Sequence, residues 1–345
     1  MLMVSFRAWT VVSIILVFTI LVVYGFLFEA EFEAILSTSW ILIILGFILG
    51  FAMIFITGVR LYVLCRILHV NISLFDSVII RGIGMFISYI TPTLIGGEPV
   101  RAVLLQRRAN NSSIGLVSSI VFIETYFDII ICNVLTLLLG FSDIAGRNFK
   151  VTLPYLAALY QITSWTTILF VGFHGVANSK VIGFLSKYTK IGVDRIKFEG
   201  EGFRWGFRKV LKPYGLLVVF TSIGSLLVGA LTFMIAGFIS GGYLSLTTSL
   251  KGFVFASSLG VSPLPGGALG VEYGASLIAN ATTVIMWRFM SYYMILLIGG
   301  LITIYAVHKL KIIMPNKNSL KTNNSEANKS DTKIPFNNSN LKLTY

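Results

Sequence analysis

The amino-acid sequence predicts an all-α membrane protein with six full spans and two helical hairpins that enter and leave the bilayer on one side. Of its 345 residues, 56% are hydrophobic and only 12% are charged, whereas a soluble domain carries about 25% charged residues. The mean hydropathy is +0.86. Several apolar runs also reach the roughly 20 residues that a helix needs to cross a bilayer. Together these features exclude a soluble globular fold.

Six apolar runs are long enough to be full spans. The first follows Arg7, as the apolar core of a signal peptide would, but it is longer than such a core and no small-residue cleavage site closes it. We therefore expect a retained helix. In chain order, the runs are residues 10–28, 40–57, 114–140, 151–174, 214–240 and 289–307.

Two further apolar stretches, 77–97 and 244–287, are interrupted by proline and glycine. Proline removes a backbone donor and glycine weakens a helix. Unwound backbone at membrane depth is stable only where protein or a water-filled cavity satisfies its polar groups. We therefore predict a re-entrant hairpin in each stretch. The residues that mark the breaks are Pro92, Pro263, Pro265, Gly266 and Gly267.

The distribution of positive charge supports this topology. With the N-terminus inside, the inner segments are 1–9, 58–113, 175–213 and 308–345, and they hold 23 of the 27 Lys and Arg residues. Cytoplasmic loops carry such an excess. This distribution predicts a multi-pass cell-membrane protein with both termini cytoplasmic. It also accounts for the net charge of +13 without nucleic-acid binding. We expect the 175–213 loop to lie on anionic headgroups.

The two interrupted stretches also resemble each other. Their Gly-Gly pairs lie 170 residues apart, and each is flanked by full spans. One hairpin is entered from the inside and the other from the outside, which predicts an inverted repeat. In secondary transporters, broken helices of such repeats mark the binding site. Residues 1–313 are expected to form one transmembrane domain, and the polar residues 314–345 a disordered tail.

The first break contains a candidate anion site at Gly96, Gly97, Glu98 and Arg101. Pro99 suits the first turn of a helix, so a helix starting at 98–99 would direct free amides and its positive end into the break. Arg101 adds a fork of donors that fits a phosphate. The alternative is that Arg101 only pairs with Glu98, three residues away.

Three carboxylates are further candidates. Glu124 and Asp128 lie one helical turn apart in the third full span, where they could bind an amine, carry a proton or pair with Arg101 or Arg81. Arg81 and Arg288 are possible partners, although Arg288 could also lie at the outer interface. Glu272 follows the second break and either recognises a cation, couples to protons or caps the returning helix.

No motif for a metal, nucleotide or catalytic nucleophile is present. The three histidines are scattered near span ends without ligand spacing. We therefore expect no metal, no cofactor and no catalytic residues.

The segment 96–101, the Glu124/Asp128 pair and the segment 262–272 resemble the membrane family UPF0104. This family corresponds to the transmembrane, flippase-like region of bacterial lysylphosphatidylglycerol synthases, and the resemblance extends to about residue 313. An arginine often follows the glutamate of the third-span pair in that family, whereas this chain has Thr125. The glycine after Pro-Gly-Gly is displaced to Gly270.

The resemblance implies a flippase-like transporter that moves an aminoacylated, glycosylated or otherwise polar-headed lipid between leaflets. Arg101 and the helix start would hold the phosphate, and Glu124, Asp128 and Glu272 would face the headgroup or carry protons. The soluble aminoacyl transferase domain is absent, so we expect no synthase activity. Two alternatives are a membrane-embedded transferase or hydrolase that uses Glu124 and Asp128 as acid and base, and an accessory subunit of a lipid-modifying or glycosylation enzyme.

Overall fold

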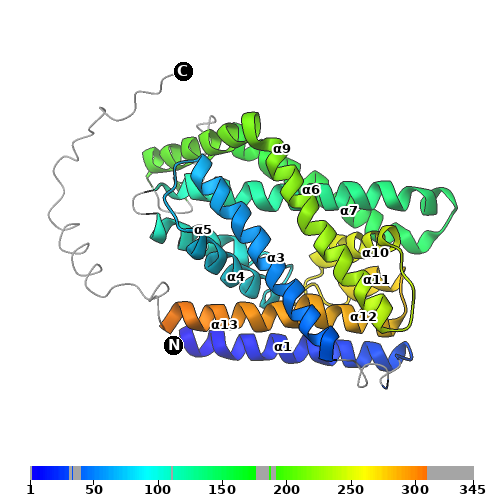
Figure 1. The fold of residues 1–345 in the computed structure, drawn as a ribbon. Coiled ribbons are helices and arrows are strands. Elements are labelled where there is room, and N and C mark those ends of the chain that lie inside the picture. Colours follow the sequence, from blue (N-terminus) through cyan, green and yellow to red (C-terminus); the bar gives the residue numbers. More distant parts are fainter. Residues whose placement is uncertain are drawn as a thin grey trace. The chain divides into compact units, whose positions relative to one another are not determined.

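The computed structural model describes residues 2–30, 33, 40–109, 112–175, 186–187 and 192–308, and these residues are almost entirely helical (Figure 1). The α-helices are α1 (Leu2–Leu27), α3 (Trp40–Ile67), α4 (Leu74–Ile90), α5 (Gly97–Arg108), α6 (Ile114–Ala145), α7 (Thr152–Gly175), α9 (Val193–Ile239), α10 (Leu246–Ser258), α11 (Gly270–Ser276), α12 (Ala281–Arg288) and α13 (Met294–His308). Short turns η1 (Phe149–Val151), η2 (Leu259–Val261) and η3 (Phe289–Tyr293) join some of them.

The chain divides into two units, Met1–Ile304 and Tyr305–Tyr345. Only the first four residues of the second unit are described, and they continue α13. The predicted disordered tail, 314–345, lies outside the described residues. The account below concerns the first unit.

The expected six membrane spans are confirmed among the described residues by helix length and apolar composition. They cover Thr10–Leu27, Ile44–Ile67, Ile114–Ala145, Phe149–Phe173, Val193–Ile239 and Ala281–His308. The protein is therefore a multi-pass membrane protein.

Three span boundaries differ from the sequence-based prediction. Helix α3 continues beyond residue 57 to Ile67, because apolar residues resume after Arg60. The last span begins at Ala281 and not at residue 289, since Asn280 caps α12 and the helix then runs on through η3.

The third difference concerns the predicted 175–213 loop. From Val193 onward it is helical and forms the first part of α9, a single helix of 47 residues. At 1.5 Å per residue such a helix is about 70 Å long, more than twice the hydrocarbon thickness of a bilayer. This early part of α9 is held against α6, because the Glu199 carboxylate accepts a hydrogen bond from the Gly115 amide at 2.7 Å. Phe207 also packs against Phe122 of α6.

Each interrupted stretch forms a pair of short helices around a break. Helices α4 and α5 pack together, and so do α10 and α11. A Cβ at Gly97 would overlap the Gly84 carbonyl oxygen and the Ser88 hydroxyl, so glycine permits the close approach of α5 to α4. In the second break, Gly266 and Gly267 adopt positive φ angles of 61° and 67°, which glycine tolerates without strain.

The two breaks meet. Pro92 of the first and Pro265 of the second form an isolated antiparallel bridge. Tyr89, at the end of α4, stacks on Tyr292 of η3 with ring centroids 5.2 Å apart, and the Tyr292 hydroxyl donates to the Tyr89 carbonyl at 3.1 Å. Segments far apart in the chain thus come together at the interruptions of both helical pairs.

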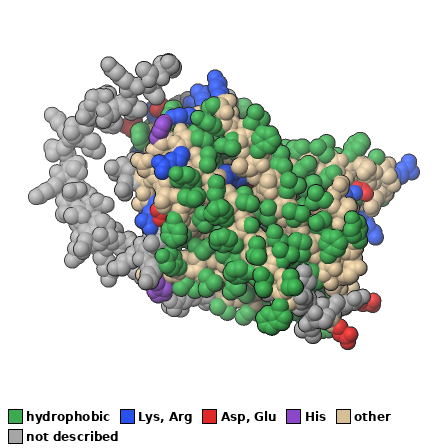
Figure 2. Space-filling view, in the orientation of Figure 1, with side chains coloured by type: hydrophobic (Ala, Val, Ile, Leu, Met, Phe, Trp, Pro, Cys, Tyr) green, Lys and Arg blue, Asp and Glu red, His purple; other side chains and the backbone are tan. Residues whose placement is uncertain are grey.

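Hydrophobic side chains cover much of the face drawn in Figure 2, and Lys and Arg side chains gather toward its edges. Large apolar side chains such as Leu138, Phe141 and Phe170 are more than half exposed. A water-soluble protein rarely exposes apolar surface on this scale. It is the surface expected of helices whose outer faces contact lipid.

Replacement of Gly97 by alanine is expected to destabilise the protein by about 1–3 kcal/mol, the usual consequence of overpacking a close contact. Gly215→Ala in α9 is the matched control, because nothing lies within 4 Å of a Cβ there. Thermal unfolding in detergent should show a lower midpoint for Gly97→Ala and an unchanged or higher one for Gly215→Ala. Equal midpoints for the two variants would contradict the close packing of α4 and α5.

Candidate functional site

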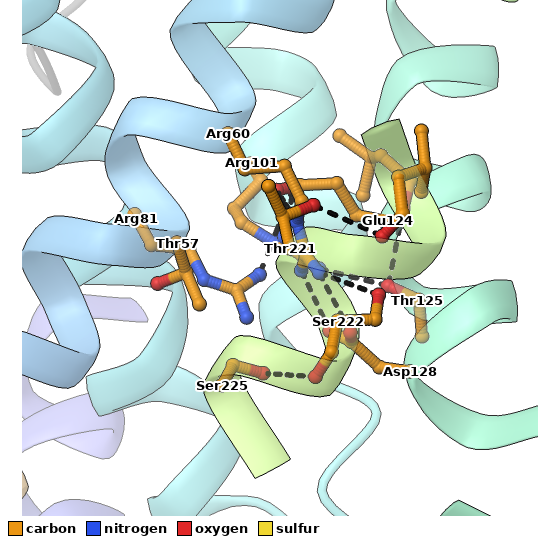
Figure 3. Close-up of polar contacts among 12 residues, drawn as sticks. Thr57, Arg60, Arg81, Arg101, Glu124, Thr125, Asp128, Thr221, Ser222 and Ser225 are labelled. Atoms are coloured by element: carbon orange, nitrogen blue, oxygen red, sulfur yellow. Dashed lines mark hydrogen bonds and ion pairs between the residues drawn. The ribbon is translucent and has the colours of Figure 1, made fainter. Parts of the chain in front are cut away.

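The candidate site is a buried ionic network of six side chains that lies among five helices (Figure 3). Helices α3, α4, α5 and α6 supply the charges, and α9 supplies a hydroxyl. The members of the network are Arg60, Arg81, Glu98, Arg101, Glu124 and Asp128.

Arg60 makes the most contacts. Its Nη1 and Nη2 atoms donate to the two carboxylate oxygens of Asp128 at 2.7 and 2.6 Å, and its Nε donates to Glu124 Oε1 at 3.0 Å. The Ser222 hydroxyl of α9 accepts a further bond from Nη1 at 2.8 Å. Bidentate arginine–carboxylate contacts are strong and fix orientation. Arg60 therefore joins α3, α6 and α9 at one point.

Arg101 brings the first break into the same network. Its Nη1 donates to Glu124 Oε2 at 2.9 Å, and its Nη2 donates to the Thr125 hydroxyl at 3.0 Å and to Glu98 at 3.3 Å. Helix α5 begins at Gly97, which confirms the predicted helix start and places Pro99 in the first turn. Gly84 makes room for the side chain, since a Cβ there would crowd the Arg101 stem.

Arg81 and Glu98 are held more loosely. Arg81 Nη1 lies 3.8 Å from Glu124 Oε2, beyond hydrogen-bond distance. Its Nε and the Oε2 atom of Glu98 are buried without a hydrogen-bond partner among the described residues.

A second ion pair lies at the other break. Arg288 Nε donates to Glu272 Oε1 at 2.6 Å, and Arg288 Nη2 donates to the Gly266 carbonyl at 3.0 Å. The Arg288 guanidinium also lies over the Tyr292 ring, 4.9 Å from its centroid. Tyr292 belongs to η3, a π-helical turn within the last span, and such turns often occur at functional sites.

A cavity of about 160 Å³ lies where the two breaks meet. Tyr89 and Leu94 line it from the first break, and Gly266 and Arg288 from the second. Its other walls are largely apolar and come mainly from α3, α9 and α10. The guanidinium of Arg288 is thus the charged group at its wall.

The structure brings most of the predicted site residues together. Gly96 and Gly97 lie at the start of α5, and Glu98 and Arg101 share the network with Glu124 and Asp128. The alternative pairing of Arg101 with Glu98 is present, but Arg101 pairs at a shorter distance with Glu124. Among the three carboxylates, Glu272 is the exception because it pairs with Arg288.

Of the three predicted arginine partners of Glu124 and Asp128, Arg101 and Arg81 are correct and Arg288 is wrong. Arg81 does face Glu124. Arg288 is buried and bonded to Glu272, so it does not pair with Glu124 or Asp128. It sits at the end of α12, because the last span starts eight residues earlier than predicted.

Sequence reasoning missed Arg60 and Ser222. Arg60 was assigned to an inner segment because the apolar run was ended at residue 57. The signal that could have identified it is the apolar sequence that resumes immediately afterwards and carries α3 to Ile67. A lone charge flanked by apolar residues on both sides is a candidate for an intramembrane functional residue.

Among the residues that the structure describes, no group of three or more His, Cys, Asp or Glu side chains is arranged to hold a metal ion. The side chains that meet in the network are guanidiniums, carboxylates and hydroxyls. Such groups suit recognition of a phosphate or an amine, and transfer of protons between carboxylates.

Comparison with known proteins gives two matches. Residues 8–299 match the family described as the lysylphosphatidylglycerol synthase TM region. Over 135 residues the chain is 30% identical to a UPF0104 membrane protein of Archaeoglobus fulgidus, and the match covers 38% of this chain and 40% of that protein. The chain therefore matches less than half the length of this relative. No solved structure matches the chain.

Replacement of Glu124 by glutamine is expected to destabilise the protein by about 3–5 kcal/mol, because it leaves Arg60 and Arg101 buried without a full counter-charge. Asp143→Asn is the control. It weakens the ion pair between Asp143 and Lys251, whose side chains are each at least one-fifth exposed, and such a pair contributes at most about 1 kcal/mol. Unfolding in detergent measures both, and an equal loss would contradict the importance assigned to Glu124.

Proposed function

Because the chain belongs to the family of the lysylphosphatidylglycerol synthase TM region, we propose that it moves a polar-headed lipid from one bilayer leaflet to the other. The observation that carries the proposal is the buried ionic network beside an interrupted helical pair. Charges in the middle of a membrane protein are costly and mark substrate or ion pathways. A lipid headgroup is the polar object that must pass through such a region while its chains remain in the bilayer.

The proposed topology places each break inside the membrane. In it, α4–α5 and α10–α11 are re-entrant hairpins of opposite orientation, and both chain termini lie in the cytoplasm. The bridge between Pro92 and Pro265 supports this arrangement, because two hairpins entering from opposite leaflets would meet near the midplane. Transporters built from inverted repeats carry their substrate sites at such meeting points.

We propose that the α5 start, from Gly96 to Glu98, and Arg101 hold the lipid phosphate. Glu124, Asp128 and Glu272 would then contact the headgroup or carry protons. In the structure each of these charged side chains already has an ion-pair partner within the protein, so binding would proceed by exchange of partners. A phosphate could replace Glu98 or Glu124 as the partner of Arg101. The guanidinium would then never be buried without a counter-charge, a state of high free energy.

The headgroup belongs to the proposal as well. The family takes its name from the synthase of lysylphosphatidylglycerol, so an aminoacylated phospholipid is the first candidate, and a glycosylated lipid is the second. The matched region is the transmembrane region of the synthase. The proposal therefore includes transport and no aminoacyl transfer.

A leaflet-resolved assay in proteoliposomes tests the function. We expect the wild-type chain to move a phosphatidylglycerol labelled on an acyl chain between leaflets, measured by dithionite bleaching of the outer leaflet. Arg101→Ala and Glu272→Ala should each slow this movement at least about tenfold, because each removes one member of a buried ion pair. Lys251→Ala, which breaks an ion pair outside the network, is the control and should move lipid at the wild-type rate.

Three results would contradict the proposal. Equal movement by wild type, Arg101→Ala and Glu272→Ala would remove these residues from the pathway. A new lipid species on mass analysis would instead support the membrane-embedded enzyme. Stable co-purification of a lipid-modifying enzyme with no lipid movement would support the accessory-subunit alternative.

A further inference from the structure

We propose that Arg81 is a binding site for a phosphate group, and that it receives the phosphate of the lipid before Arg101 does. This inference rests on the proposed transport function and adds a residue to it. The observation behind it is that the guanidinium of Arg81 has an incomplete set of partners. It lies beside Arg60 and Arg101, which already bond the nearby carboxylates.

The bonding capacity of the nearby carboxylates is taken up by the other two arginines. Arg60 bonds both oxygens of Asp128 and one oxygen of Glu124. Arg101 bonds the other Glu124 oxygen at 2.9 Å. Arg81 reaches that same oxygen only at 3.8 Å, and its Nε is buried without a partner among the described residues.

The carboxylates of the network lie closer to Arg60 and Arg101 than to Arg81. Three guanidiniums face Glu124 and Asp128, and the third carboxylate of the network, Glu98, contacts Arg101 at the longer distance of 3.3 Å. An isolated positive charge in a membrane interior normally has a partner or a function, and here the described residues supply an incomplete partner.

The surroundings of Arg81 suit a phosphate. Its guanidinium is directed toward the Glu124 carboxylate, and the hydroxyl-bearing residues Thr57, Ser222 and Ser225 lie in the same region (Figure 3). A guanidinium can present two parallel donors to a phosphate. The Thr57 and Ser225 hydroxyls already donate to backbone carbonyls and the Ser222 hydroxyl accepts from Arg60, so the guanidinium itself is the group that would hold the phosphate. The phosphate of a lipid and inorganic phosphate share this chemistry, so both are candidate ligands.

The same contacts indicate how an anion could reach the network and which arginine it would bind first. The side chain of Arg81 is 11% exposed, and those of Asp128 and Glu98 are 26% and 24% exposed, so the network is open on some of its sides. Binding at Arg101 requires the loss of existing bonds to Glu124, Glu98 or Thr125. Binding at Arg81 requires no such loss. An arriving anion therefore meets Arg81 at lower cost than Arg101.

Ligand-dependent unfolding of the purified full-length chain in neutral detergent tests this assignment. The probes are short-chain phosphatidylglycerol, sodium phosphate, and short-chain diacylglycerol as the phosphate-free control. We expect phosphatidylglycerol to raise the unfolding midpoint of the wild type and diacylglycerol not to do so. For Arg81→Gln, the concentration of phosphatidylglycerol that gives half the effect should rise at least about tenfold, as for the loss of a charge-assisted hydrogen bond. A response to sodium phosphate comparable to that of the lipid would identify free phosphate as the ligand.

The same experiment separates a binding role from a structural one. Because Arg81 is incompletely paired, Arg81→Gln without ligand should unfold at or above the wild-type midpoint, and Arg81→Lys should recover part of the response to phosphatidylglycerol. Arg66→Gln is the matched control, since Arg66 is exposed and bonds only Tyr62 among the described residues. A ligand-free Arg81→Gln protein that unfolds well below the wild type would overturn the proposal, as would an unchanged response to phosphatidylglycerol.

Failure of this inference can be told apart from failure of the transport function. If the wild type moves labelled phosphatidylglycerol in proteoliposomes and Arg81→Gln moves it equally fast, the assignment of Arg81 is wrong and transport stands. If the wild type binds phosphatidylglycerol through Arg81 but moves no lipid, phosphate binding stands and transport fails. A wild type with no response to either phosphate probe would refute the Arg81 site directly.

Discussion

The contact of Arg60 with Glu124 and Asp128 is the constraint on which the rest of the site depends. A buried guanidinium is tolerated only if its charge and donors are largely satisfied. Three carboxylate oxygens and one hydroxyl accept four of the five N–H groups of Arg60. This requirement fixes α3, α6 and α9 against one another. It also leaves the second oxygen of Glu124 free to accept from Arg101, so the position of α5 follows from that of α6.

Features that depend on one short segment, such as a helix start or the helical face of a side chain, could be predicted from the sequence. The proline at position 99 and the glycines at 96 and 97 place the start of α5, and the spacing of Glu124 and Asp128 places them on one helical face. Which arginine pairs with which carboxylate could not be predicted in this way. The pairing of Arg60 with Asp128 joins residues 68 positions apart, and it depends on how α3 packs against α6. The pairing of Glu272 with Arg288 likewise required the last span to begin at Ala281.

The two breaks carry ion pairs of reversed polarity. In the first, an arginine on the short helix, Arg101, pairs with a glutamate on the long span, Glu124. In the second, a glutamate on the short helix, Glu272, pairs with an arginine on the last span, Arg288. Each pair ties an interrupted segment to a continuous helix. The Tyr89–Tyr292 stack joins the end of α4, beside the first break, to the last span.

Stability alone does not explain why these charges are retained. Apolar side chains of similar volume often stabilise a protein as well as a buried ion pair does, and they would spare the helices the desolvation of six ionisable groups. The network also leaves polar atoms of Arg81 and Glu98 buried without hydrogen-bond partners among the described residues, and the second ion pair leaves one oxygen of Glu272 in the same state. A purely structural cluster would be expected to satisfy them. Incomplete pairing keeps alternative partners within reach at small energetic difference, and that is the property a site needs if it must bind a charged headgroup, release it and restore its internal bonds.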